Sequence, residues 1–193
     1  VPIPAPNPAN LEKDLPKVRH IVEDSGAKIV LTTGPHLLAL RAYGAVNAVK
    51  SLKQWCDPCE RWYMGLQWYS AGHQNYSEGA RGGDTAPVPK PDDAAFLQYT
   101  SGSTAKPKGV VVSHRSLMHN MLVIVTALRA RTDTIVVSWL PQFHDMGLIG
   151  SCLALLFCGG SGYYMSPLSF IKDPLLWLRL VTYYEGTHLQ GPN

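Results

Sequence analysis

The chain has 193 residues, of which 46% are hydrophobic and 16% are charged, so it can bury a core and lacks the composition of a disordered protein. Its formal net charge is only +3, and its Lys and Arg residues are scattered singly, which excludes the basic surface typical of proteins that bind nucleic acid or anionic membranes. Its four cysteines are too few for a disulfide scaffold, and we expect a reducing, cytoplasmic compartment.

The first half of the chain begins with regular patterns and then loses them. Residues 1–8 are rich in proline and predict an extended segment, because proline opposes a helix there. From residue 54 to 91, glycine and proline break every long element. The elements expected in this half are a helix capped by Asn10 and ended by a left-handed Gly26, a strand over 28–32, a weakly amphipathic helix over 37–52, and a short strand over 66–69.

The second half alternates apolar strands with helices. Residues 134–140 form the most strand-like segment, with a continuous β-branched run that predicts a buried position in a sheet. The other strands expected here cover residues 94–100, 110–112 and 162–165, and a last strand begins within 187–190. Three helices are expected: one that follows a Ser113 cap, one over 146–158, and one from Asp173-Pro174 to about 184.

This alternation predicts an α/β, layered fold with a largely parallel sheet flanked by helices. Such folds bind ligands at the carboxyl ends of their strands. Residues 146–171 carry no formal charge, but Gly159, Gly160, Gly162 and Pro167 interrupt the run, so we predict no membrane span.

Cys56 and Cys59 have the C-x-x-C spacing of a redox pair or of half a zinc site. No second half-site follows at a workable distance, so a loop with two reduced thiols is the favoured interpretation. We assign no metal-ligating residues, and a small redox or zinc protein stays as an alternative.

Residues 100–109, with the sequence TSGSTAKPKG, carry the densest chemical signal in the chain and lie between two predicted strands. Hydroxyls and glycine-exposed backbone N–H groups can surround phosphate oxygens, and Lys108 adds a full positive charge. The Walker A pattern G-x-x-x-x-G-K-S/T, the hydrolase elbow G-x-S-x-G and the dinucleotide pattern G-x-G-x-x-G all fail here. A polar surface loop without a ligand is the competing interpretation.

The loop resembles the phosphate-binding loop of the adenylate-forming superfamily, T-S-G-S/T-T-G-x-P-K-G, and departs from it only at Ala105, where the family has glycine. Three further segments are similar to the long-chain fatty-acyl-AMP ligase branch: FLQY at 96–99, SWLPQFHDMGLIG at 138–150 and MSPLSF at 165–170, followed by the terminal GPN. The resemblance covers essentially the whole chain and is weakest over residues 54–91.

By this resemblance, residues 1–193 are part of the large N-terminal domain of an adenylate-forming enzyme, without its C-terminal domain. The N-terminal sequence VPIPAP has no initiator Met and no signal-peptide pattern, so we expect the chain to start within a longer protein. The chain alone is then expected to be inactive.

The reaction implied by the resemblance is attack of a fatty-acid carboxylate on the α-phosphate of ATP, which gives acyl-AMP and pyrophosphate. Its cofactors are ATP and Mg²⁺, and an acyl carrier protein or polyketide synthase module is a possible partner. The expected catalytic residues are His144 and Lys108. The expected phosphate-binding residues are Thr100, Ser101, Gly102, Ser103, Thr104, Lys108 and Gly109. The expected acyl pocket contains Trp139, His144, Met146, Gly191 and Pro192.

Two alternatives stay open for the function. An acyl-CoA ligase would share the same loop. A degenerate acyl- or nucleotide-binding module without catalysis is the other, because a Cβ at Ala105 would cost on the order of 1 kcal/mol if the backbone there is left-handed or approaches a phosphate closely.

Overall fold

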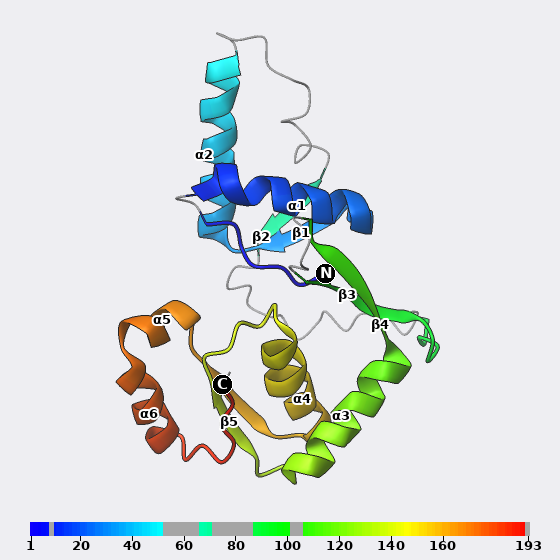
Figure 1. Cartoon of the computed structure of the whole chain (residues 1–193). Helices are drawn as coiled ribbons and strands as arrows, with labels where there is room; N and C mark the ends of the chain where they lie inside the picture. The colour runs from blue at the N-terminus through cyan, green and yellow to red at the C-terminus, as the bar shows by residue number, and fades with distance from the viewer. Residues whose placement is uncertain (8–9, 52–65, 71–86, 101–105, 192–193) are drawn as a thin grey trace, which may run out of the picture. The chain divides into compact units, whose positions relative to one another are not determined.

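A computed structural model describes residues 1–7, 10–51, 66–70, 87–100 and 106–191 (Figure 1). The chain divides into two compact units. The α1 unit, named for helix α1 (Leu11–Ser25), consists of residues 4–88 and 99–109. The β5 unit, named for strand β5 (Ile135–Ser138), consists of residues 1–3, 89–98 and 110–193.

In the α1 unit, helix α1 (Leu11–Ser25) has an apolar face with the spacing of a packed helix. It ends at Gly26 in the left-handed conformation, with φ 65°, as the sequence predicts. The predicted cap at Asn10 is wrong, because its backbone is not extended there and its side chain makes no capping hydrogen bond. The buried residues of this face are Leu11, Leu15, Val18 and Ile21.

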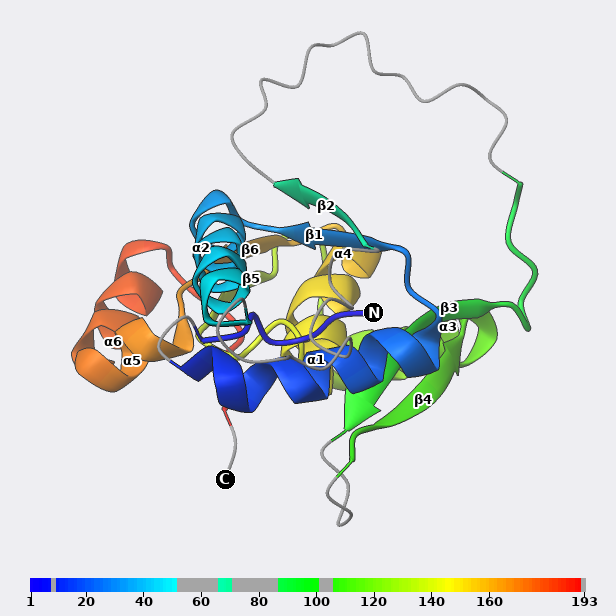
Figure 2. The same ribbon diagram turned by 90° about the horizontal axis from the view of Figure 1, so that it is seen from above.

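A parallel strand pair completes the α1 unit. Strands β1 (Ile29–Thr32) and β2 (Gln67–Ser70) pair in parallel and lie side by side in Figure 2. Helix α2 (Gly34–Ser51) connects toward them and begins three residues before the predicted start, because Pro35 is a favourable residue in a first turn. Strands β1 and β2 confirm the strands predicted over 28–32 and 66–69, each within one residue at its ends.

Strands β3 (Ala94–Thr100) and β4 (Lys108–Ser113) form a second two-stranded sheet. Strand β3 has its predicted bounds, whereas β4 begins two residues before the predicted strand and includes Lys108. Helix α3 (His114–Leu128) follows, and the hydroxyl of Ser113 accepts a hydrogen bond from Ser116 N, which confirms the predicted cap.

The β5 unit is organised around strand β5 (Ile135–Ser138), which pairs in parallel with β6 (Ser161–Tyr164). Between them run the π-helix η3 (Met146–Leu153) and helix α4 (Ala154–Cys158), and α3 packs against both of these helices. Two short helices, α5 (Pro167–Lys172) and α6 (Pro174–Tyr183), follow β6. The buried apolar residues of this unit are Met121, Val136, Val137, Leu140, Ala154 and Leu155.

Four points of the prediction for the β5 unit need correction. The segment 146–158 is helical but begins as a wider π-helix, and α5 was not predicted at all, although Ser166 caps it with a Pro at its first turn. Asp173 makes no capping hydrogen bond, because its carboxylate pairs with Arg179 instead. Residues 187–190 form one parallel bridge, Val136 with His188, in place of a strand.

The α/β class with parallel strand pairing is confirmed, and the described strands are arranged as three pairs. In the described ranges, the helices are too short or too polar to cross a membrane.

Candidate functional site

Strands β3 and β4 deliver the two ends of the predicted phosphate loop. Thr100 is the last residue of β3 and is exposed, and Lys108 and Gly109 are the first residues of β4. Lys106 and Lys108 are also exposed. An exposed ammonium group is a compact charge on a flexible stem, so both lysines present their charge to solvent at this end of the sheet. The remaining predicted loop residues lie outside the described residues: Ser101, Gly102, Ser103 and Thr104, with Ala105.

Both ends of the loop are hydrogen-bonded to helix α1. The Tyr99 hydroxyl donates to Asp24 Oδ2 at 2.5 Å, and His20 Nε2 lies 3.0 Å from the Pro107 carbonyl oxygen. Partial burial and the neighbouring Asp24 carboxylate raise the pKa of Tyr99 to about 12, so the hydroxyl stays a donor at neutral pH.

A second group of predicted residues lies at the carboxyl end of β5. The indole of Trp139 stacks on the ring of Phe170, with centroids 4.1 Å apart and planes inclined by 3°. The Trp139 Nε1 atom is buried and has no hydrogen-bond partner among the described residues. A Cβ on Gly191 would lie 4.0 Å from Trp139 Cζ2, so the structure brings these two predicted acyl-pocket residues together. Pro192, predicted beside them, lies outside the described residues.

His144 and Asp145 pair with each other through His144 Nδ1 and Asp145 Oδ1. Their side chains are 68% and 64% exposed, so this pair lies at the surface of the β5 unit. Asp145 Oδ1 also accepts a hydrogen bond from Met146 N at 2.7 Å and thereby caps η3. Met146, a predicted acyl-pocket residue, is 43% exposed at the start of that helix.

A buried polar network joins η3 to the end of the chain. Ser151 Oγ donates to Gln190 Oε1 at 2.8 Å, and Gln190 Nε2 donates to the Gly150 carbonyl at 3.3 Å. Ser138 Oγ lies 3.3 Å from Ser151 Oγ, and both serines are 1% exposed. The Tyr164 hydroxyl donates to the Ser151 carbonyl at 2.8 Å, and burial, with a contribution from Cys152, raises its pKa.

Sequence reasoning missed this network and the contacts of α1. Ser138 and Ser151 interrupt otherwise apolar segments, and this interruption was the only available signal. The contacts of His20 and Asp24 join residues that are 87 and 75 positions apart, and no local pattern indicates such pairs.

The described residues hold no group of three or more His, Cys, Asp or Glu side chains that could bind a metal ion. Cys152 and Cys158 are free thiols. Cys56 and Cys59, the alternative redox or zinc pair, lie outside the described residues.

Comparison with known proteins gives the same family from sequence and from structure. The model of the AMP-binding enzyme family matches residues 5–193. A medium-chain fatty acid–acyl-carrier-protein ligase of Moorena producens is 33% identical over 199 aligned positions, which cover 100% of this chain and 30% of that protein. A long-chain fatty acid–AMP ligase of Mycobacterium marinum is 40% identical over 112 positions, 55% of this chain and 19% of that protein.

Among solved structures, a fatty acyl-adenylate ligase from L. pneumophila, in complex with acyl adenylate and pyrophosphate, superposes with a TM-score of 0.72 at 34% identity. The match covers 94% of this chain and 28% of that one, so the chain spans less than a third of the length of these relatives. With a family match over nearly every residue and a loop that fits the family pattern, the chain belongs to the AMP-binding enzyme family.

Proposed function

We propose that this chain supplies the phosphate-loop part of an enzyme that activates a fatty acid with ATP. The observation that carries the proposal is the 34% identity, over 94% of the chain, to a structure solved with acyl adenylate and pyrophosphate. In the reaction, a carboxylate oxygen forms a bond to the α-phosphorus, and the bond between that phosphorus and the bridging oxygen breaks. The electron pair leaves with pyrophosphate, and acyl-AMP remains.

Both reactants are anions, so the residues of this chain have to align them and offset their charge. The proposal gives Lys108 and the backbone of residues 100–104 and 109 the task of holding the β- and γ-phosphates. Lys108 fits this task, because it is exposed at the first position of β4. When bound with ATP, Mg²⁺ would offset phosphate charge, and the proposal assigns none of the described residues to hold it.

At the end of β5, the proposal gives Trp139, Met146, Gly191 and Pro192 to the acyl pocket and His144 to positioning of the carboxylate. The contact between Trp139 and Gly191 supports this grouping. The pairing of His144 Nδ1 with Asp145 Oδ1 supports this assignment, because a partner at Nδ1 directs the tautomer and leaves Nε2 as the ring nitrogen that would face the carboxylate.

The acceptor of the acyl group separates the remaining alternatives. A carrier protein is the first candidate, because the Moorena producens relative is named for one. Coenzyme A is the second, and a non-catalytic binding module is the third, on account of Ala105. The proposal treats residues 1–193 as part of the family's large N-terminal domain and, from the sparse cysteines, places the protein in the cytoplasm.

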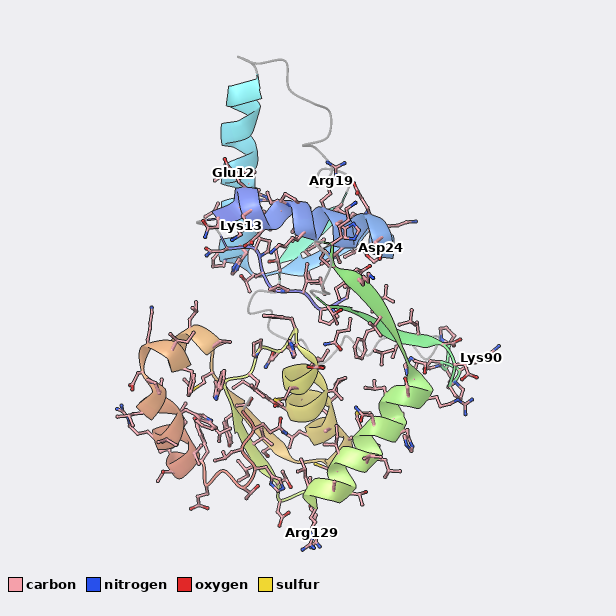
Figure 3. The ribbon with its side chains drawn as sticks, in the orientation of Figure 1. Glu12, Lys13, Arg19, Asp24, Lys90 and Arg129 are labelled. Atoms are coloured by element: carbon pink, nitrogen blue, oxygen red, sulfur yellow. The ribbon has the colours of Figure 1, made fainter. Side chains whose placement is uncertain are left out.

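The experiment is fatty-acid-dependent ATP–pyrophosphate exchange, measured on the longest natural protein that contains this chain, over a series of acyl lengths and with or without coenzyme A. We expect exchange without coenzyme A, and a loss on the order of a hundredfold in Lys108→Ala. Lys90→Ala is the matched control, since Lys90 is exposed and outside the loop (Figure 3). Ala105→Gly should leave exchange equal or raise it. Absence of exchange with every fatty acid would refute the proposal.

A further inference from the structure

The two ends of the phosphate loop are tied to a single helix. Tyr99 stands directly before the loop and Pro107 near its end, and each is hydrogen-bonded to a side chain of α1. We infer that His20, Asp24 and Tyr99 are positioning residues, which hold the ends of the loop at the spacing that ATP phosphates require. This inference rests on the proposed function of the loop and adds three residues that the loop pattern does not include.

The two anchor points on α1 are adjacent. His20 and Asp24 are four positions apart, which places them on the same side of the helix about 6 Å apart along its axis. Figure 3 shows Asp24 in the last part of α1. The helix itself is held in the α1 unit by its buried face, of which Val18 and Ile21 are 7% exposed each. The anchors therefore transmit the rigidity of a packed helix to the loop ends.

The donor and acceptor of each bond follow from chemistry. The Pro107 carbonyl oxygen can only accept, so His20 Nε2 is the donor. The Asp24 carboxylate can only accept when ionised, so the Tyr99 hydroxyl is the donor. A hydrogen bond to a charged group is stronger than one between neutral groups, so the Tyr99–Asp24 bond is the stronger of the two anchors.

Tyr99 also contacts the other end of the loop directly. A Cβ built on Gly109 would lie 2.9 Å from Tyr99 Cζ and 3.1 Å from its hydroxyl oxygen. The ring of Tyr99 therefore lies against the Gly109 backbone, and the absence of a side chain at Gly109 is what allows this approach. One tyrosine thus joins β3, β4 and the carboxylate of Asp24.

Fixed loop ends lower the entropy that a ligand has to remove when it orders the loop. Seven residues, 100–106, separate Tyr99 from Pro107 in the sequence. If either anchor is removed, ATP has to order the loop ends itself. The expected effect is a rise in KM for ATP without a comparable change in KM for the fatty acid, because the proposed function gives the phosphates to the loop and the fatty acid to the residues at the end of β5.

The test uses Tyr99→Phe and His20→Ala in the longest natural protein that contains this chain. The first readout is hydrogen exchange at the amides of Thr100, Lys106, Lys108 and Gly109, which should become faster in both variants while α1 amides do not change. Tyr69→Phe is the matched control, because it removes a tyrosine hydroxyl of the same unit that donates to Gln67 Oε1 within strand β2.

The second readout is steady-state kinetics. We expect KM for ATP to rise about tenfold in Tyr99→Phe and less in His20→Ala, with kcat and KM for the fatty acid changed less than twofold. His20→Gln, which keeps a side-chain N–H donor, should restore part of the effect, and Asp24→Asn should be milder than Asp24→Ala because it keeps an acceptor oxygen.

The possible failures can be told apart. Wild-type protein without ATP–pyrophosphate exchange would refute the proposed function, while hydrogen exchange would still report on the anchors. If the Tyr99→Phe and His20→Ala variants fold and the amides at the loop ends keep wild-type rates of hydrogen exchange, the anchoring is overturned. If hydrogen exchange at the loop ends becomes faster but KM for ATP does not change, the positioning role is overturned.

Discussion

Gly147 is the position where the structure predicts the largest cost for the smallest change. A Cβ on Gly147 would lie 2.1 Å from the Pro141 carbonyl oxygen and 2.7 Å from its carbon. These are backbone atoms in the loop that leads to His144, and the oxygen would have to retreat by more than about 1 Å to reach van der Waals distance. Since a backbone cannot rotate away as a side chain can, we expect Gly147→Ala to lose about 3 kcal/mol, the upper end for overpacking.

For a cooperative unit of about 150–250 residues, that loss corresponds to a fall in Tm of roughly 6–12 °C. Circular dichroism melting measures it directly. Gly191→Ala is the matched control, because its added Cβ would meet only Trp139 Cζ2 at 4.0 Å, an ordinary contact. The control should melt within about 2 °C of the wild type. If Gly147→Ala melts together with the control, the close approach of Pro141 to Gly147 does not exist in solution and our account of the His144 loop is wrong.

Three further predictions concern single hydrogen bonds. Because the pKa of Tyr99 is raised to about 12, the stability that its neutral form provides is complete below pH 10 and is lost as pH rises through 12. A phenolate absorbance titration, with Tyr99→Phe as the reference, should show this late ionisation. Ionisation of Tyr99 near pH 10 would contradict it. Ser151→Ala leaves Gln190 Oε1 without its buried donor and should cost about 1–3 kcal/mol in urea unfolding, so an unchanged midpoint would reject the network. Ser113→Ala removes the cap of α3 and should cost about 1 kcal/mol, whereas Asn10→Ala, which removes no capping bond, should cost clearly less; equal losses would refute the assignment.

Local patterns in the sequence were sufficient where an element is stabilised by its own neighbours. Strand β3 has its predicted bounds because its apolar run ends at a polar loop, and α1 ends at Gly26 because a left-handed residue stops a helix. The π-helix was not predictable in this way. The apolar pattern of residues 146–158 indicates a helix, but the wider turn depends on the tertiary surroundings of Gly147 and Ser151.

The same distinction between local patterns and long-range contacts applies to the candidate site. The candidate phosphate loop could be proposed from the sequence because its residues are contiguous, so one segment carries the whole pattern. The contacts that hold its ends could not, because His20 and Asp24 bind Pro107 and Tyr99, which lie 87 and 75 positions away in the sequence. Lys108 is expected within the loop, because the predicted strand begins only at residue 110. In the structure it begins β4.

The segment that leads to Gly191 is held mainly by side chains. Its main chain pairs with β5 at one bridge, Val136 with His188, where a full strand would have formed several. Thr187 Oγ1 accepts from Ile135 N at 2.9 Å, and Gln190 binds Ser151 and the Gly150 carbonyl. Gln190 can approach because Gly150 has no Cβ, which would lie 3.2 Å from the Gln190 Oε1 atom. The position of Gly191 beside Trp139 therefore depends on Ser151, which is buried in η3 and binds Gln190. A change at Ser151 would displace Gly191 and so alter the predicted acyl pocket.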